Sequence, residues 1–177
     1  MESLVELAAL IKQKTLIDSK IAAMIGRPAQ LGHIGEYVAS KVFGIALNDS
    51  ASAKGSDGWF KSGPLNGRTV DVKWYGKREG LLDINPDGVP DYYLVFTGPK
   101  TAAGSSRGTT RPWVIEAVYL FDAPRLVKTL TAGGLRVGIA TSVKQEFWDE
   151  AEIYPVQRNR VYVVSDEQRR DLALFGP

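Results

Sequence analysis

The chain of 177 residues has no cysteine and a single histidine, His33. Without cysteine there are no disulfide bonds and no thiolate zinc sites, and one histidine excludes zinc sites that need two or more. No apolar run reaches the length of about 18 residues that a membrane span requires. The first residues carry acids and no basic segment typical of a signal peptide. We therefore expect a cytoplasmic protein that does not enter a membrane.

The charge balance is also modest, with a formal net charge of +2. A nucleic-acid-binding surface would therefore have to be a local patch. The length and an apolar content of 44% suit one globular domain over residues 1–177. The four tryptophans are interpreted as core residues.

Helical periodicity and capping residues predict helices at residues 2–14, 18–25, 31–45, 122–130, 142–153 and 165–174. Apolar alternation or continuous apolar runs predict strands at residues 58–61, 67–75, 92–97, 113–121, 137–140 and 161–164. Residues 48–58 and 98–111 are expected to be loops, and residues 85–88 a turn. Helices first, then a hairpin, then mixed elements predict a mixed α/β fold with a central mixed sheet flanked by helices.

The strand predicted around Thr69–Tyr75 carries an unusual pair of charges. Its apolar residues alternate with Asp71 and Lys73, so both charged side chains share the face opposite the apolar one. An acid-x-Lys triplet occurs about once by chance in a chain of this composition. Asp18-Ser19-Lys20 is such a triplet, on a predicted helix. The alternative interpretation of Asp71 and Lys73 is a surface ion pair, which would contribute little stability.

Two further acids precede this strand. Asp57 lies in Gly55-Ser56-Asp57-Gly58, ahead of the hairpin, and Glu36 lies on a predicted helix. The order is an acid on a helix, an acid before a hairpin, and Asp-x-Lys on the returning strand. It resembles the PD-(D/E)XK, or restriction-endonuclease-like, nuclease superfamily over residues 31–97. Ser56 stands where the family name has proline, and Pro90-Asp91 is interpreted as a strand entry because no acid-x-Lys follows it.

The resemblance implies a restriction-endonuclease-like core and a set of roles. Asp57 and Asp71 would bind a magnesium ion with the help of the Val72 carbonyl, and Mn²⁺ can substitute. Lys73 would orient the attacking water, and Glu36 would be a further catalytic acid. No other cofactor is implied. Enzymes of this kind commonly act on DNA as homodimers, which suits a two-stranded substrate.

Basic residues on both sides of the motif are candidates for contact with DNA phosphates. Small donors and cations on loops fit such contacts. Each of them also has the alternative interpretation of an ordinary solubilising charge. The candidates are Lys54, Lys61, Arg68, Lys77, Arg78, Lys100, Arg107 and Arg111.

Our first hypothesis is a magnesium-dependent endodeoxyribonuclease, with a compact type II restriction enzyme as one form of it. The alternatives are a nucleic-acid-binding or regulatory module on the same fold that does not cut, and a sheet protein with an unrelated role. The nuclease hypothesis requires Asp57 and Asp71 to meet. We expect a hairpin register with Phe60 opposite Arg68 or Val70, or a bulge near Gly58, because a one-residue slip would send Asp57 to the apolar face.

Overall fold

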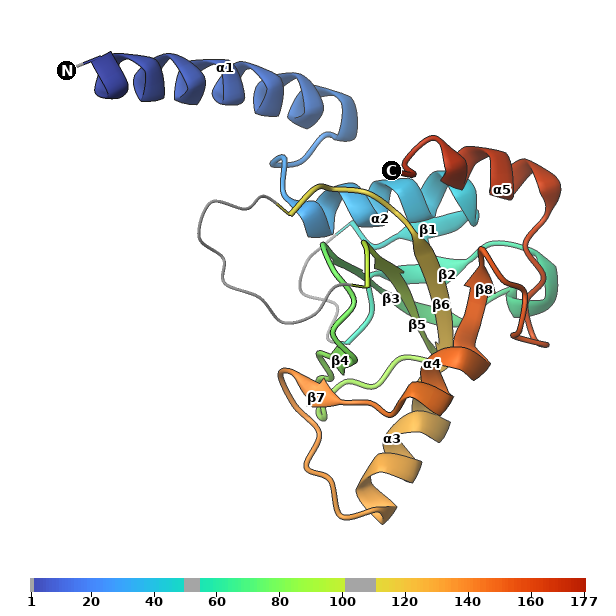
Figure 1. Cartoon of the computed structure of the whole chain (residues 1–177). Helices are drawn as coiled ribbons and strands as arrows, with labels where there is room; N and C mark the ends of the chain where they lie inside the picture. The colour runs from blue at the N-terminus through green and yellow to red at the C-terminus, as the bar shows by residue number, and fades with distance from the viewer. Residues whose placement is uncertain (1, 50–54, 101–110) are drawn as a thin grey trace.

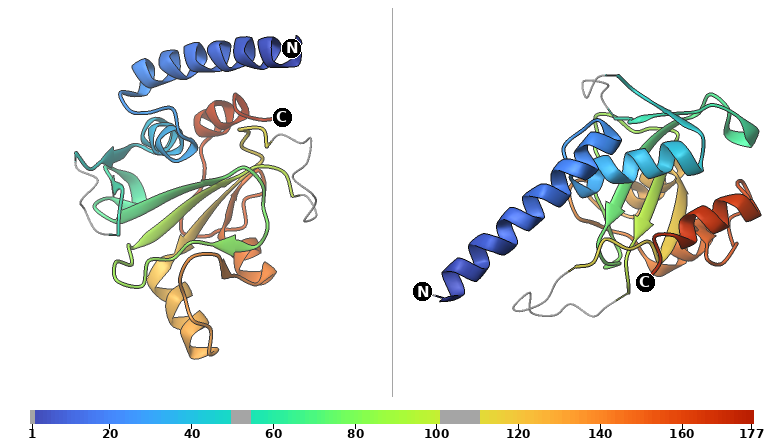
Figure 2. Two further views of the ribbon diagram at one scale, coloured as in Figure 1. Left: turned by 90° about the vertical axis from the view of Figure 1, so that its left-hand side faces the viewer. Right: turned by 90° about the horizontal axis from the view of Figure 1, so that it is seen from above.

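The computed structural model describes residues 2–49, 55–100 and 111–177. Within them, a sheet of six strands has α2 and α5 over one face and α3 and α4 over the other (Figures 1 and 2). The helices are α1 (Glu2–Ile25), α2 (Leu31–Val42), α3 (Ala123–Ala132), α4 (Gln145–Ala151) and α5 (Asp166–Ala173). The main-sheet strands are β1 (Ile45–Leu47), β2 (Gly58–Phe60), β3 (Thr69–Tyr75), β5 (Tyr92–Thr97), β6 (Ala117–Asp122) and β8 (Glu152–Tyr154). The predicted mixed α/β class, with a central mixed sheet between helices, is confirmed.

The first 24 residues of the described chain form one helix, α1, where the sequence predicted two. Asp18, expected to cap a second helix, instead accepts a hydrogen bond from Lys14 one turn earlier. This i,i+4 pair supports a continuous helix. The helix ends as predicted at Gly26, whose φ of 72° is the left-handed conformation that glycine adopts without steric cost.

Helix α2 lies on the sheet directly over β3. A Cβ on Gly35 would stand 3.3 Å from the Cβ of Trp74, so the absence of a side chain allows this close approach. The helix ends at Val42 instead of Ile45, because Gly44 turns the chain with a φ of 64° and Ile45 starts β1. This placement brings the middle of α2 over the strand that carries the predicted site.

The main sheet has the order β1-β2-β3-β5-β6-β8. Its central pair, β3 and β5, is parallel, and every other pair is antiparallel. Strand β5 is buried on both faces, as its continuous apolar sequence predicted. In β3, Val70, Val72 and Trp74 are buried, and the residues between them are half-buried on the other face.

The hairpin register agrees with the even alternative predicted from the sequence. Gly58 pairs with Val70, Trp59 pairs with Thr69, and the Phe60 N–H donates to the Arg68 carbonyl at 3.0 Å. Pro90-Asp91 is a strand entry, as interpreted. Asp91 precedes β5, and its carboxylate accepts hydrogen bonds from the N–H and the hydroxyl of Thr69 at the start of β3.

The C-terminal half differs from prediction in several elements. Residues 137–140 and 161–164 are not strands, and β6 starts at Ala117 instead of Trp113. Ser142 does not cap α4, because it belongs to β7 (Thr141–Ser142), which pairs with β4 (Leu81–Leu82). The main chain around Tyr162 is bound by the side chains of Gln157 and Asn159 in place of a strand partner.

Two predicted helix caps in this half are confirmed. Asp122 accepts from the Arg125 N–H at the start of α3, and Ser165 and Gln168 form a capping box on α5. The tryptophans divide equally. Trp74 and Trp148 are core residues, whereas Trp59 and Trp113 are each 43% exposed, contrary to prediction.

No helix among residues 2–49, 55–100 and 111–177 combines the length and the apolar character needed to cross a membrane. That includes α1, which has the length but carries charges along most of it.

The position of Asp57 depends on Gly58, which gives a first prediction. A Cβ at Gly58 would lie 2.1 Å from the Ala46 carbonyl oxygen of β1, and this main-chain neighbour cannot move aside cheaply. Gly58→Ala should therefore lower the free energy of unfolding by about 2 kcal/mol or more. Gly32→Ala on α2 is the matched control, since nothing lies within 4 Å of its Cβ position, and it should stabilise by about 0.5–1 kcal/mol. Urea denaturation would measure both, and an unchanged midpoint for Gly58→Ala would contradict the close β1–β2 packing.

Candidate active site at the edge of strand β3

The site begins where β2 stops pairing with β3. Strand β2 starts at Gly58, so among the described residues no strand pairs with β3 beyond Val70 on that side. The Asp57 N–H donates to the Val70 carbonyl at 2.9 Å, and the Asp57 Oδ2 accepts the Val72 N–H at 2.7 Å. We expected Asp57 on the polar face of the hairpin. Its carboxylate instead lies at the sheet edge, because it takes the hydrogen bond that a longer β2 would have made.

The Asp57 carboxylate lies close enough to Asp71 for its charge to affect the pKa of Asp71. Burial raises the pKa of Asp71 to about 6, Lys73 opposes that rise, and the neighbouring Asp57 adds to it. Two acids this close repel each other when both are ionised, unless a proton or a cation lies between them. Asp57 and Asp71 are therefore neighbours, although Asp57 approaches from the sheet edge and not from the polar face of the hairpin.

Lys73 completes this cluster from the next position on the same face of β3. Its Nζ lies 3.1 Å and 2.9 Å from the two Asp71 carboxylate oxygens. The side chains of Lys73 and Asp71 are only 15% and 18% exposed, so the pair is not the solvated surface ion pair considered as an alternative. Burying two charges costs desolvation energy that an ion pair often fails to recover, so stability alone is a poor explanation of this pair.

The sequence pattern did not mark Tyr93 as a site residue. It pairs directly with Asp71 across the parallel β3–β5 ladder, and the Lys73 Nζ lies 5.4 Å from the centre of its ring. Among the described residues its buried hydroxyl has no hydrogen-bond partner. Burial raises the pKa of this hydroxyl to about 12, and the Asp71 charge adds to that effect, so it remains a proton donor at neutral pH. The only feature of the sequence that could have indicated Tyr93 is its hydroxyl group within an otherwise apolar strand.

Glu36 is held beside the cluster by an arginine. The side chain is 14% exposed, and the Arg27 guanidinium binds its Oε2. Burial raises the pKa of Glu36, the nearby Asp57 charge adds to the rise, and Arg27 opposes it. Glu36 is therefore not a solvent-facing residue, and its negative charge reaches the Asp57 end of the site. Arg27, in the α1–α2 connection, was not singled out from the sequence.

The predicted phosphate-contacting residues fall into three groups. Lys54 and Arg107 lie outside the described residues. Lys77 and Arg78 are engaged within the fold, because Lys77 pairs with Glu79 and Arg78 binds the Tyr119 hydroxyl at 3.1 Å and stacks on Trp148. The other four, all exposed, are Lys61, Arg68, Lys100 and Arg111.

Among these exposed cations, two have a defined position near β3. Arg68 forms a 3.4 Å ion pair with Asp91 at the start of the strand. Arg111 lies beside Gly76, directly after the strand, where a Cβ on Gly76 would be 3.3 Å from the Arg111 Cβ. Positive charge therefore stands beyond both ends of the strand that carries Asp71 and Lys73.

A cavity of 330 Å³ opens beside Lys73. Its other walls are Asp83, Ile84, Asn85 and Pro86 on one side and Gly138 and Ile139 on the other. The Asp83 Oδ1 accepts the Ala140 N–H at 2.7 Å, which ties the two walls together. Among the described residues, its lining includes Lys73 but neither Asp57 nor Asp71.

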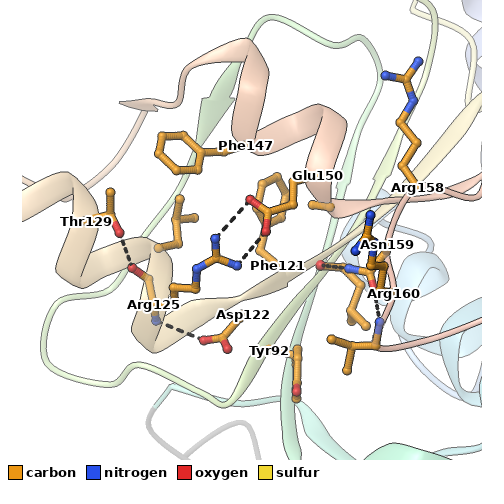
Figure 3. A pocket seen from close by; sticks show the side chains of 14 residues that line it. Tyr92, Phe121, Asp122, Arg125, Thr129, Phe147, Glu150, Arg158, Asn159 and Arg160 are labelled. Atoms are coloured by element: carbon orange, nitrogen blue, oxygen red, sulfur yellow. Dashed lines mark hydrogen bonds and ion pairs between the residues drawn. The ribbon is translucent and has the colours of Figure 1, made fainter.

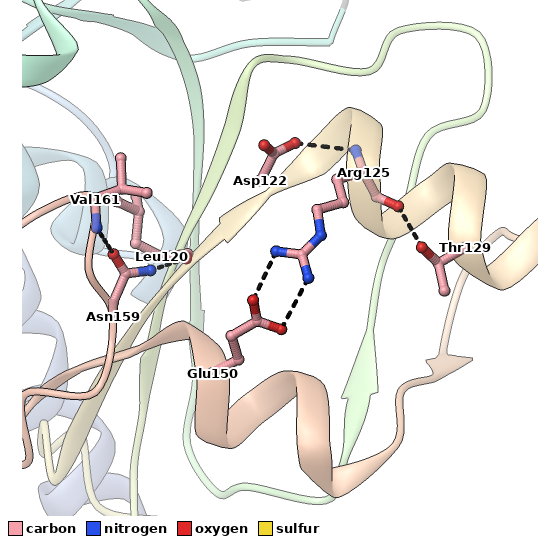
Figure 4. A network of polar contacts seen from close by, with 7 residues as sticks. All are labelled: Leu120, Asp122, Arg125, Thr129, Glu150, Asn159 and Val161. Carbon is pink, nitrogen blue, oxygen red and sulfur yellow. Dashed lines mark hydrogen bonds and ion pairs between the residues drawn. The ribbon is translucent and has the colours of Figure 1, made fainter.

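A second cavity, of 430 Å³, lies between α3, α4 and residues 158–161 (Figure 3). Arg125 and Glu150 form a bidentate ion pair across it, with distances of 2.6 Å and 3.2 Å. Asp122 caps α3, and Asn159 binds the Leu120 carbonyl and the Val161 N–H (Figure 4). These polar groups are bound within the fold, so we interpret them as structural residues.

The donors at the β3 edge suit a hard cation. Two carboxylates are available, and the Val72 carbonyl points to the same edge as its N–H, because both groups of a strand residue face one side. Mg²⁺ prefers oxygen ligands and commonly takes only one or two protein carboxylates. Within the described residues, no three His, Asp or Glu side chains converge as a metal-binding group. This agrees with Glu36 being bound to Arg27, and it leaves Asp57, Asp71 and Val72 as the fitting set.

No known protein-family model matches the sequence, and no curated protein matches it.

The raised pKa of Asp71 predicts that Asp57→Asn raises the melting temperature of the protein, and that the rise depends on pH. The asparagine can still accept the Val72 N–H, but it removes the negative charge beside Asp71. Because folding raises the Asp71 pKa from its ordinary value of 3.8 to about 6, folded wild type loses stability as the pH rises through this range, and the loss persists above it. Asp57→Asn should thus melt higher than wild type at pH 8, by about 2–4 °C per kcal/mol gained, and show no gain at pH 4.

The control for this measurement is Asp87→Asn, which changes an exposed acid in the 85–88 turn. It should melt like wild type at both pH values. If Asp57→Asn shows no greater gain at pH 8 than at pH 4 in scanning calorimetry, the two carboxylates do not interact as described.

Proposed function

We propose that this chain is a magnesium-dependent endodeoxyribonuclease with a restriction-endonuclease-like core, of the kind that includes type II restriction enzymes. The observation that carries the proposal is the Asp57 carboxylate, bound by the Val72 N–H at the edge of β3, beside the half-buried ion pair of Asp71 and Lys73. These are the residues that the sequence resemblance assigns to metal binding and catalysis. The element order supports the same core, since an acid-bearing helix, a hairpin and a parallel neighbour of β3 follow one another.

The chemistry of phosphodiester hydrolysis explains why this donor set is useful. The phosphate group is negative and repels both an incoming hydroxide and the carboxylates of the protein. Mg²⁺, when bound, supplies positive charge that offsets this repulsion and lowers the pKa of a bound water. Asp57, Asp71 and the Val72 carbonyl are the groups of this chain that would hold it.

In this proposal, Lys73 orients the attacking water. Its hydrogen bonds to Asp71 hold the ammonium beside that carboxylate, and its burial would strengthen the charge it presents to a phosphate. The Lys73 ammonium also makes a cation–π contact with the Tyr93 ring. Glu36 and Arg27 form an ion pair near Asp57. The negative charge of Asp57 raises the pKa of Glu36.

Cleavage of DNA by purified protein tests the proposal directly. Wild type should nick or cut plasmid DNA with Mg²⁺ and not with a chelator present. Asp71→Ala and Lys73→Ala should each lower the rate by about 10²-fold or more, since each removes charge stabilisation at the reacting phosphate. Asp87→Ala and Lys128→Ala are matched controls at exposed positions and should cut at the wild-type rate.

The same assay separates the alternatives. Wild-type rates in the Asp71 and Lys73 variants would remove both residues from catalysis. Binding of DNA by wild type without any cleavage would favour the non-catalytic module on this fold. Neither binding nor cleavage would leave the buried ion pair without a nucleic-acid role.

A further prediction concerns Arg111, which lies beside the end of β3. Arg111 is exposed beside Gly76, so Arg111→Ala should weaken DNA binding similarly across sequences and reduce the slope of log K against log salt by about 1. Arg136→Ala, an exposed arginine after α3, is the matched control and should leave the slope unchanged. Titrations by fluorescence anisotropy at several salt concentrations would measure both, and an unchanged slope for Arg111→Ala would place this residue outside the interface.

A further inference from the structure

Helix α1 projects from the body of the protein (Figures 1 and 2). Its large apolar side chains remain exposed although it is the longest described helix. The exposed fractions are Leu4 69%, Val5 71%, Leu7 51%, Leu10 54%, Ile11 55%, Leu16 59%, Ile17 56% and Met24 74%. Only near its C-terminal end are apolar side chains half-buried, at Ile21, Ala22 and Ile25.

The exposed apolar side chains of α1 indicate that this helix binds a partner. Helices in proteins owe most of their stability to packing of an apolar face, and α1 has no such packing along most of its length. A contiguous apolar surface of this extent marks an interaction site. The helix is about 36 Å long at 1.5 Å per residue, which is long enough for a two-helix interface.

The apolar residues follow the spacing of a helix–helix seam. Leu7, Leu10, Ile17, Ile21 and Met24 alternate at intervals of three and four once Lys14 is included in the series. The Lys14 ammonium is bound by Asp18, so its charge is already paired within the helix, and its methylene groups can lie along the seam. A seam of this kind suits another amphipathic helix.

The flanking charges indicate which helix, and in which direction. Glu6 and Lys20 both stand one residue before a seam residue, so they lie on the same flank. In an antiparallel pair of α1 helices, same-flank positions face each other, which sets Glu6 against the partner subunit's Lys20, twice by symmetry. A parallel pair would instead leave Glu6 and Lys20 each facing an apolar residue of the partner.

We propose that α1 is a self-association surface on which two copies of this chain pack antiparallel, with Glu6 beside the partner's Lys20. Such an interface lies near or below the lower end of stable protein interfaces, about 1,200 Å² in total, so a dissociation constant in the micromolar range is expected. The dimer would form without DNA or metal, so its test is independent of the proposed nuclease activity.

Single cysteines introduced into the full-length chain, which has none of its own, test the geometry. Residue 13 is midway between 6 and 20, so Gln13→Cys should couple to itself through a short bismaleimide. Glu6→Cys and Lys20→Cys should not, since like positions would lie about 21 Å apart, but a mixture of the two should couple. Self-coupling of Glu6→Cys, or no coupling of Gln13→Cys, would overturn the antiparallel arrangement.

Sedimentation velocity over 1–200 µM tests the association itself. Leu10→Asp should weaken it at least tenfold, and Val163→Asp, at an apolar residue 69% exposed outside α1, should not. Glu6→Lys and Lys20→Glu should each weaken association, and the double exchange should restore it. A wild-type monomer throughout the range, or a dimer indifferent to Leu10→Asp, would overturn the proposal. Circular dichroism confirms that each variant keeps the folded body.

Discussion

The hydrogen bond from the Val72 N–H to the Asp57 carboxylate is the contact on which the site depends. It exists because β2 begins only at Gly58, so that none of the described strands pairs with β3 at Val72 on this side. A main-chain donor that would otherwise be unpaired thereby fixes an acid at the sheet edge. That acid meets Asp71, and the crowding of the two carboxyl groups in a half-buried position follows from this one interaction.

The remaining structure holds this edge in place from both faces. Gly35 lets α2 approach β3 closely, which brings Glu36 to the same end of the sheet. On the other face, Lys73 lies over the ring of Tyr93, which belongs to a buried cluster with aromatic residues of β6 and α4. The buried ion pair costs desolvation energy, so its support by two layers of packing is consistent with a site selected for chemistry.

The sequence alone predicted the alternation of β3, the buried β5, the hairpin register and two of the helix caps. These features depend on neighbours in the chain, so local patterns suffice to find them. Val161–Val164 was misassigned because the Gln157 and Asn159 side chains, not a neighbouring strand, bind its main chain. Tyr93 and Arg27 were missed because their roles depend on contacts across the sheet and between helices. The place of Asp57 at the edge depends on where β2 stops, which no local pattern marks.

Arg27 lies just beyond the end of α1, after Gly26, and its guanidinium binds Glu36. Arg27 therefore connects the end of α1 with Glu36 beside the site. A change in the direction in which α1 leaves the body is a change in the backbone that positions Arg27. Whatever holds α1 in one orientation also restricts the position of the cation that opposes the rise in the Glu36 pKa, so the direction of α1 and the electrostatics of the sheet edge are linked through Arg27.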